Sequence, residues 1–253
     1  MPRTIYTPLL LTTIILVIGG FLILVSASMV ISEKNFGILG YYALRQLLYG
    51  GILGTIGCFI ASCIPYRTWK RFAPFLMLAA FTLLALLFIP NISYNSGGAR
   101  RWLQFGDISF QPAEFLKFSF IVYLASWLDT RKKEAGTVSH GMIPFAIMLA
   151  LVSVFLVMQP DIGTLGIIAI TALILYFLGG GKIYQLATLT FLGFAVFYFL
   201  VQLAPYRLAR ILVFFNPGTD VQGIGYQINQ ALIAIGSGGF WGLGLGRGLQ
   251  KYH

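Results

Sequence analysis

The chain has 253 residues, of which 58% are hydrophobic and only 9% are charged. Soluble domains carry about 25% charged residues, so a soluble fold of this length could not hide so much apolar side chain from water. The net charge of +10 suits anionic lipid headgroups and membrane topology signals, and no basic soluble module argues for nucleic-acid binding. Cys58 and Cys63 match no metal or redox spacing, and one of the two histidines is the last residue, so we expect no disulfide framework and no histidine-based metal site.

Seven apolar runs follow one another along the chain, and each approaches the length of about 20 residues that a helix needs to cross a bilayer. They cover residues 8–31, 41–64, 73–90, 112–128, 142–158, 162–180 and 185–203. The first run is too long for the apolar core of a signal peptide, which has about 7–15 residues. We therefore expect an all-α, polytopic transmembrane helical bundle over residues 1–203, with about seven spans.

Cations are unequally divided between the short loops at the two ends of the predicted helices. One set of loops contains eight: Arg3, Arg67, Lys70, Arg71, Arg131, Lys132, Lys133 and Lys182. The other set contains three: Lys34, Arg100 and Arg101. Because cytoplasmic loops carry the excess of Lys and Arg, we expect the N-terminus in the cytoplasm. Residues 92–111, the turn at 159–161 and everything after about residue 203 then face outside.

Residues 204–253 differ in character from the bundle, because polar residues and glycines interrupt the apolar sequence. Six of the eleven residues from Gly236 to Gly246 are glycine. Residues 226–235 can form one short helix, and non-helical backbone at membrane depth must be buried in protein or line a watery cavity. We expect this segment to be the start of a large, Gly-rich extracytoplasmic loop, with a re-entrant or surface-lying part.

The start of the fourth run carries two charged residues on the side predicted to be outside. Pro112 suits the first turn of a helix, and Glu114 in that turn is favoured by the helix dipole. Lys117 follows three residues later on the same face, about one turn into the apolar run. A cation at that depth marks a functional site by default. The alternative is an interfacial lysine that reaches water beside Glu114.

Further candidates lie in the preceding loop and in the turn between the fifth and sixth runs. Arg100 and Arg101 can bind an anionic group, since a guanidinium fits phosphate, or they can anchor lipid headgroups, with Trp102 in an interfacial belt. Asp161 can pair with Arg101 or Lys117, or it can cap the sixth helix. Together these residues predict an outward-facing cavity with both signs of charge, suited to a lipid-linked anionic substrate.

Four ordered motifs resemble one protein family. "GARRW", "FQPAEFLK", "QPDIGT" and "GYQINQALIAIGSGGFWGLGLG" are similar to the SEDS proteins (shape, elongation, division and sporulation), the family of FtsW, RodA and SpoVE. The ending "GLGLGRGLQKY" is more similar to the cell-division branch than to the elongation branch.

The resemblance implies a peptidoglycan glycosyltransferase that polymerises lipid II on the outer face of the bacterial plasma membrane. It implies a class B penicillin-binding protein and other division proteins as partners. The substrate-binding residues that it carries over are Arg101, Glu114, Lys117, Gln159 and Asp161. Arg101 and Lys117 would stabilise the departing pyrophosphate, and the two carboxylates would orient those cations. A divalent cation is possible, although no ligand set in the sequence demands one.

Two departures qualify the resemblance. The family usually has Ser where this chain has Ala113. The family also has ten membrane helices and, after the Gly-rich stretch, an aspartate proposed as the general base, which would lie beyond residue 253. We therefore expect a C-terminally truncated sequence that contains no catalytic base and does not polymerise lipid II alone. The alternatives are a transporter or flippase for lipid-linked precursors and a non-catalytic division partner, but no internal repeat favours a transporter.

Overall fold

The computed structural model describes residues 6–89, 93–96, 99–106, 108–203, 205–219, 222–223, 225–244 and 246–248. The chain packs as two compact units, one made of residues 1–63 with 199–253 and the other of residues 64–198. We call them unit 1 and unit 2. The predicted division at residue 203, between a transmembrane bundle and a Gly-rich extracytoplasmic loop, stays a prediction.

Unit 1 consists of a long hairpin and the segments that follow the last long helix. Its first helix, α1, covers Tyr6–Phe36, and the return arm is formed by α2 (Tyr41–Arg45), a π-helical segment (Gln46–Ile52) and α3 (Leu53–Cys63). The later part holds α9 (Pro205–Phe215), a short 3₁₀ turn (Pro217–Thr219) and α10 (Tyr226–Gly238). The backbone amide of Gly246 donates to the Ser26 hydroxyl at 2.7 Å, which ties the two parts of unit 1 together.

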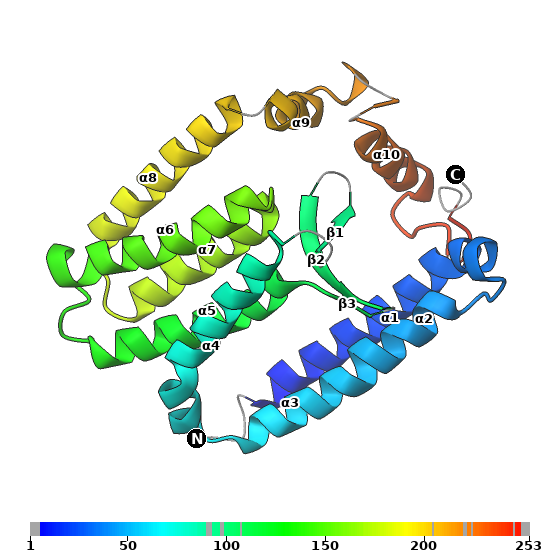
Figure 1. Cartoon of the computed structure of the whole chain (residues 1–253). Helices are drawn as coiled ribbons and strands as arrows, with labels where there is room; N and C mark the ends of the chain where they lie inside the picture. Colours follow the sequence, from blue (N-terminus) through cyan, green and yellow to red (C-terminus); the bar gives the residue numbers. More distant parts are fainter. Residues whose placement is uncertain are drawn as a thin grey trace. The chain divides into compact units, whose positions relative to one another are not determined.

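Unit 2 is a helical bundle with a small sheet at one end (Figure 1). Its helices are α4 (Tyr66–Leu86), α5 (Pro112–Thr130), α6 (Ile143–Met158), which a π-helical turn (Val138–Met142) precedes, and α7 (Ile162–Leu178). Helix α8 (Ile183–Gln202) begins in this unit. Between α4 and α5 the strands β1 (Ser93–Ser96), β2 (Ala99–Phe105) and β3 (Ile108–Phe110) form an antiparallel sheet in the order β1-β2-β3.

The core of unit 2 is a single apolar cluster. Helix α4 contributes Ala80 and Leu84, which are four residues apart and therefore lie on one face, and α5 contributes Leu116, Phe120 and Leu124 at the same spacing. Leu103 of β2 joins this cluster with no exposed surface, so the sheet is anchored to the helices.

A Pro inside α4 is accommodated by a contact with α5. Pro74 cannot donate to the carbonyl of Lys70, and the Ser126 hydroxyl donates to that carbonyl at 3.4 Å instead. The Lys70 ammonium also bonds the Asp129 carboxylate at 2.6 Å. Since Lys70 is in the first turns of α4 and Asp129 is in the last turn of α5, the two helices run antiparallel.

The end of unit 2 away from the sheet is held by a buried tyrosine. The Tyr176 hydroxyl donates to the Ala135 carbonyl at 2.8 Å and lies 3.2 Å from Oε1 of Gln185. That oxygen also accepts from the Lys182 amide at 2.9 Å. The contacts fasten the turn between α7 and α8 to the segment that follows α5.

Each of the seven predicted apolar runs is helical over most of its length, and the prediction of a transmembrane helical bundle is confirmed. Among the described residues, five helical segments are long and apolar enough to cross a membrane, against the seven runs predicted, and α7 is a shorter apolar helix of 17 residues. Helix α5 has 19 residues but is not one of these five segments, and it carries the charged residues Glu114, Lys117 and Asp129. The β-sheet was not predicted, because residues 92–111 were interpreted as a loop. The helix predicted at 226–235 is present as α10.

Candidate functional site

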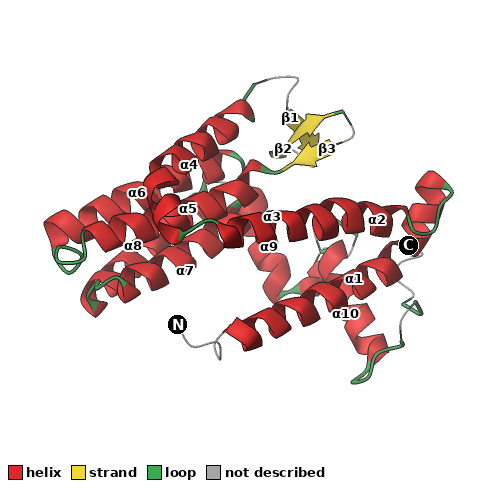
Figure 2. Cartoon of the chain, turned by 90° about the horizontal axis from the view of Figure 1, so that it is seen from below, coloured by secondary structure: helices red, strands yellow, loops and turns green. Residues whose placement is uncertain are grey.

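The sheet of unit 2, drawn in yellow in Figure 2, carries Arg101 on its middle strand, β2. In β2, Arg101 lies at a register shift, because Trp102 pairs with Tyr94 and Arg100 pairs with Asn95. Strict alternation of side chains therefore does not apply at this residue. Leu103 is fully buried in the apolar cluster, and its register partners are Ser93 on β1 and Phe110 on β3. Burial of Leu103 anchors the strand, and the hydrogen bonds of Arg101 to Gln159 and Pro160 show that its guanidinium turns toward the bundle.

The Arg101 guanidinium lies on the carboxyl end of α6. Its Nε donates to the Gln159 carbonyl at 3.3 Å, and a terminal nitrogen donates to the Pro160 carbonyl. Carbonyls after a helix end lack helical partners and carry partial negative charge, so they hold a cation well. These contacts use two of the five N–H donors of an arginine, which leaves the side chain able to bind an anion as well.

Asp161 caps the next helix. Its Oδ1 accepts from the Thr164 amide at 3.3 Å, and its Oδ2 accepts from the Gln111 side-chain amide at 3.5 Å. The residue is only 7% exposed. Of the two alternatives given for Asp161, the structure therefore supports capping, since no ion pair with Arg101 or Lys117 is found in the described part of the chain.

Gln159 is buried without satisfying its side chain. It is 2% exposed, and neither Oε1 nor Nε2 has a hydrogen-bond partner within the described ranges. A buried donor or acceptor left unpaired costs about 1–3 kcal/mol, so such groups call for a specific explanation. A polar ligand that pairs with this amide would supply one.

Glu114 and Lys117 form the ion pair predicted from their spacing. Pro112 begins α5, Glu114 is in its first turn, and the Lys117 ammonium lies 2.8 Å from a Glu114 carboxylate oxygen. The Lys117 side chain is 28% exposed and that of Glu114 is 57% exposed.

The structure therefore brings Arg101, Gln159 and Asp161 together at the junction of α6 and α7. The Glu114–Lys117 pair lies on α5, and no hydrogen bond joins it to that group among the residues described. Gln111 is a member of the group that the sequence did not identify. Its position directly before the Pro at the start of α5 was the available signal, because a residue there projects from the helix end.

Arg100 and Trp102 flank Arg101 in β2, and each pairs with a residue of β1. Arg100 is exposed and Trp102 is half-buried. Across the portion of the chain that the structure describes, no group of three or more His, Cys, Asp or Glu side chains could hold a metal ion. The candidate residues thus include the cations Arg101 and Lys117 and the side-chain amide of Gln159. The carboxylates of Glu114 and Asp161 already have partners. Such a set suits an anionic ligand.

Comparison with known proteins identifies relatives over nearly the whole chain. The FtsW/RodA/SpoVE family, described as cell cycle proteins, matches residues 7–253. A probable peptidoglycan glycosyltransferase FtsW from Coxiella burnetii is 38% identical over 243 residues, which are 96% of this chain and 65% of that protein. The stage V sporulation protein E of Bacillus subtilis is 35% identical over 244 residues, or 96% of this chain and 66% of that protein.

Two solved structures resemble the fold. A chain from a study of polymerization and crosslinking by a peptidoglycan synthase complex has a TM-score of 0.64 and 26% identity, and the match covers 87% of this chain and 64% of that one. A mutant of the rod shape determining protein RodA from Thermus thermophilus has a TM-score of 0.50 and 25% identity, over 73% of this chain and 59% of that one. This chain thus spans just under two thirds of the curated relatives' length. It is a multi-pass membrane protein and belongs to the FtsW/RodA/SpoVE family of cell cycle proteins.

Proposed function

We propose that this chain forms the substrate-holding part of a peptidoglycan glycosyltransferase that polymerises lipid II during bacterial cell division or elongation. The observation that carries the proposal is the Arg101 guanidinium on the carboxyl end of α6, beside the buried and unpaired amide of Gln159. The names of the relatives, peptidoglycan glycosyltransferase FtsW among them, agree with it.

The reaction requires positive charge at the leaving group. A sugar hydroxyl of one substrate attacks the anomeric carbon of another, and the bond from that carbon to the lipid pyrophosphate breaks. Negative charge then grows on the pyrophosphate, and preorganised cations stabilise it most effectively in a site that excludes water. We assign this role to Arg101, whose remaining N–H donors match phosphate oxygens, and to Lys117.

The two carboxylates of the site orient other groups. Glu114 holds the Lys117 ammonium, and both oxygens of Asp161 accept hydrogen bonds from Gln111 and Thr164. We assign Gln159 to a polar group of the bound substrate, because its amide is buried and has no hydrogen-bond partner among the described residues. The general base belongs, on the family resemblance, to a segment that would follow the Gly-rich stretch.

The charge distribution supports an extracytoplasmic site. In unit 2 the cations Arg67, Arg71, Lys132, Lys133 and Lys182 all lie at helix ends or turns away from the sheet. By the positive-inside rule that end faces the cytoplasm, and the sheet with Arg101 faces outside. Lipid II then presents its pyrophosphate to the site while its tail stays in the membrane. The partner we propose is a class B penicillin-binding protein that crosslinks the new strands.

Substitution of Arg101 tests the proposal. Within a protein of the full length of its relatives, Arg101→Ala should lower the rate of lipid II polymerisation about 100-fold, because loss of one charge-stabilising donor costs that much or more. Arg100→Ala is the matched control, since it removes the same charge from the exposed face of the same strand.

Binding of the partner transpeptidase, measured on the same preparations, should be unchanged in both variants. Normal polymerisation by Arg101→Ala would show that the anion site is assigned wrongly. Equal losses in both variants would mean that general surface charge, and not the site, is responsible.

A further inference from the structure

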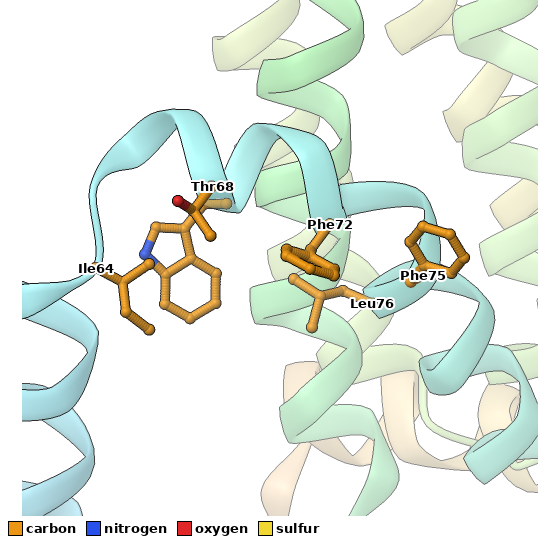
Figure 3. A pocket seen from close by; sticks show the side chains of 6 residues that line it. Ile64, Thr68, Phe72, Phe75 and Leu76 are labelled. Atoms are coloured by element: carbon orange, nitrogen blue, oxygen red, sulfur yellow. The ribbon is translucent and has the colours of Figure 1, made fainter.

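An apolar groove runs along the first half of α4, away from the candidate site (Figure 3). Its volume is about 350 Å³, within the range of small-molecule sites. The six residues that line it are Ile64, Thr68, Trp69, Phe72, Phe75 and Leu76. All of them belong to unit 2.

The groove lies on the side of α4 that does not enter the core. Ala73 and Met77 are buried in the bundle, whereas Phe75 is 66% exposed. At 3.6 residues per turn, Thr68 and Phe72 lie on roughly the opposite face from Met77. The Trp69 ring packs edge-on against Phe118 of α5, with ring centroids 5.3 Å apart, so one wall of the groove is fixed.

The length of the groove matches one leaflet of a bilayer. Thr68 and Leu76 are eight residues apart, which corresponds to about 12 Å of helix. The hydrocarbon core of a membrane is about 30 Å thick, so each leaflet contributes about 15 Å. An acyl chain of one leaflet, which extends from the membrane surface to the midplane, could therefore lie along the groove.

Two arginines lie beside the groove, Arg67 next to Thr68 at its start and Arg71 one turn further along α4. Arg67, Arg71 and the groove residue Phe75 are spaced four apart and form one stripe along α4. Both arginines are exposed, and neither has an ion-pair partner among the residues that the structure describes. Lys70, between them in sequence, differs because Asp129 neutralises it at 2.6 Å.

We propose that this groove binds an anionic glycerophospholipid, with an acyl chain along Phe72 and Leu76 and the phosphate at Arg67 and Arg71. The apolar lining selects hydrocarbon. The two arginines select negative headgroup charge, because neither forms an ion pair within the described residues, although Arg67 also contacts the Tyr66 ring. The inference does not rest on the proposed glycosyltransferase activity, because it uses neither Arg101 nor any other residue of that site.

Fluorescence quenching of Trp69 tests the proposal directly, because this ring lines the groove. Trp102, Trp127 and Trp241 are replaced by Phe so that Trp69 is the only tryptophan. The full 253-residue chain is placed in vesicles with brominated phosphatidylglycerol or brominated phosphatidylcholine at equal mole fractions. We expect stronger quenching by the phosphatidylglycerol, with a preference that falls about fivefold for each arginine in Arg67→Gln and Arg71→Gln.

Lys182→Gln is the matched control, since it removes one exposed cation from the turn between α7 and α8 and should leave the preference unchanged. A second measurement keeps Arg67 and Arg71 unaltered. Raising the salt from 0.1 to 1 M shortens the Debye length from about 10 to about 3 Å, so the preference should fall for unaltered arginines too.

Three results would overturn the proposal. Equal quenching by both lipids would mean that the groove contacts ordinary boundary lipid. Absence of quenching by either would mean that protein covers the groove. Displacement of the brominated phosphatidylglycerol by small amounts of a polyisoprenyl phosphate would assign the groove to isoprenoid lipids instead. A normal result in the Arg101→Ala polymerisation assay would leave the lipid proposal untouched.

Discussion

Gly141, in the π-helical turn that precedes α6, should not tolerate a side chain. A Cβ atom at this position would lie 2.2 Å from the Ala135 carbonyl oxygen and 2.7 Å from its carbonyl carbon. These are backbone atoms, so a rotamer change cannot relieve the overlap, and either the turn or the segment after α5 must move. Overpacking of this kind costs about 1–3 kcal/mol and occasionally more. For a chain of this size, Gly141→Ala should lower Tm by about 2–12 °C.

The assay is thermal unfolding in detergent, followed by circular dichroism. Gly193→Ala in α8 is the matched control, because nothing lies within 4 Å of a Cβ built there. That variant should be neutral or slightly more stable, since a glycine inside a helix costs about 0.5–1 kcal/mol relative to alanine. Equal melting temperatures for Gly141→Ala and the unaltered chain would refute the close approach of Ala135.

Substitutions of two further residues, Tyr176 and Asp161, probe hydrogen bonds at the two ends of unit 2. Tyr176→Phe keeps the ring but removes the hydroxyl bonded to Ala135, and it should cost about 1–2 kcal/mol, measured by the same melting experiment; an unchanged Tm would speak against that bond. Asp161→Ala removes the cap on the Thr164 amide and should cost about 1 kcal/mol, whereas Asp161→Asn keeps a capping oxygen and should cost much less. Equal losses for both Asp161 variants would show that the charge, and not the cap, stabilises the helix.

The helices could be predicted because their cause is visible in the sequence. A long apolar run must be helical in a membrane, since helical hydrogen bonds satisfy every backbone group within the segment. Local signals were also sufficient for the start of α5 at Pro112 and for the proximity of Glu114 and Lys117, and they gave the cap formed by Asp161 as one of two alternatives. Each of these depends on residues no more than four positions apart.

The sheet could not be predicted in the same way. The sequence of β2, ARRWLQF, does not alternate strictly between polar and apolar residues, so it lacks the period of two that marks a half-buried strand. Its pairing with β1 and β3 became visible only in three dimensions. The strand also decides where Arg101 points.

The hydrogen-bond acceptors of Arg101 could not be predicted from the sequence. A carboxylate was expected, and the structure provides the carbonyls of Gln159 and Pro160. Every residue has a carbonyl, so composition cannot reveal which one is unpaired and close by. The groove along α4 could not be predicted either, because it depends on the Phe118 ring that α5 places beside Trp69.

The central claim is that the sheet end of unit 2 faces outside and the cationic end faces the cytoplasm. Labelling of single cysteines with a membrane-impermeant thiol reagent tests it in cells, after Cys58 and Cys63 are replaced by alanine. Ser109→Cys places a thiol at an exposed position of β3, and Lys133→Cys places one at an exposed position after α5. We expect labelling of the Ser109→Cys variant in intact cells and of the Lys133→Cys variant only after permeabilisation. The reverse pattern would put Arg101 in the cytoplasm and contradict the proposed function.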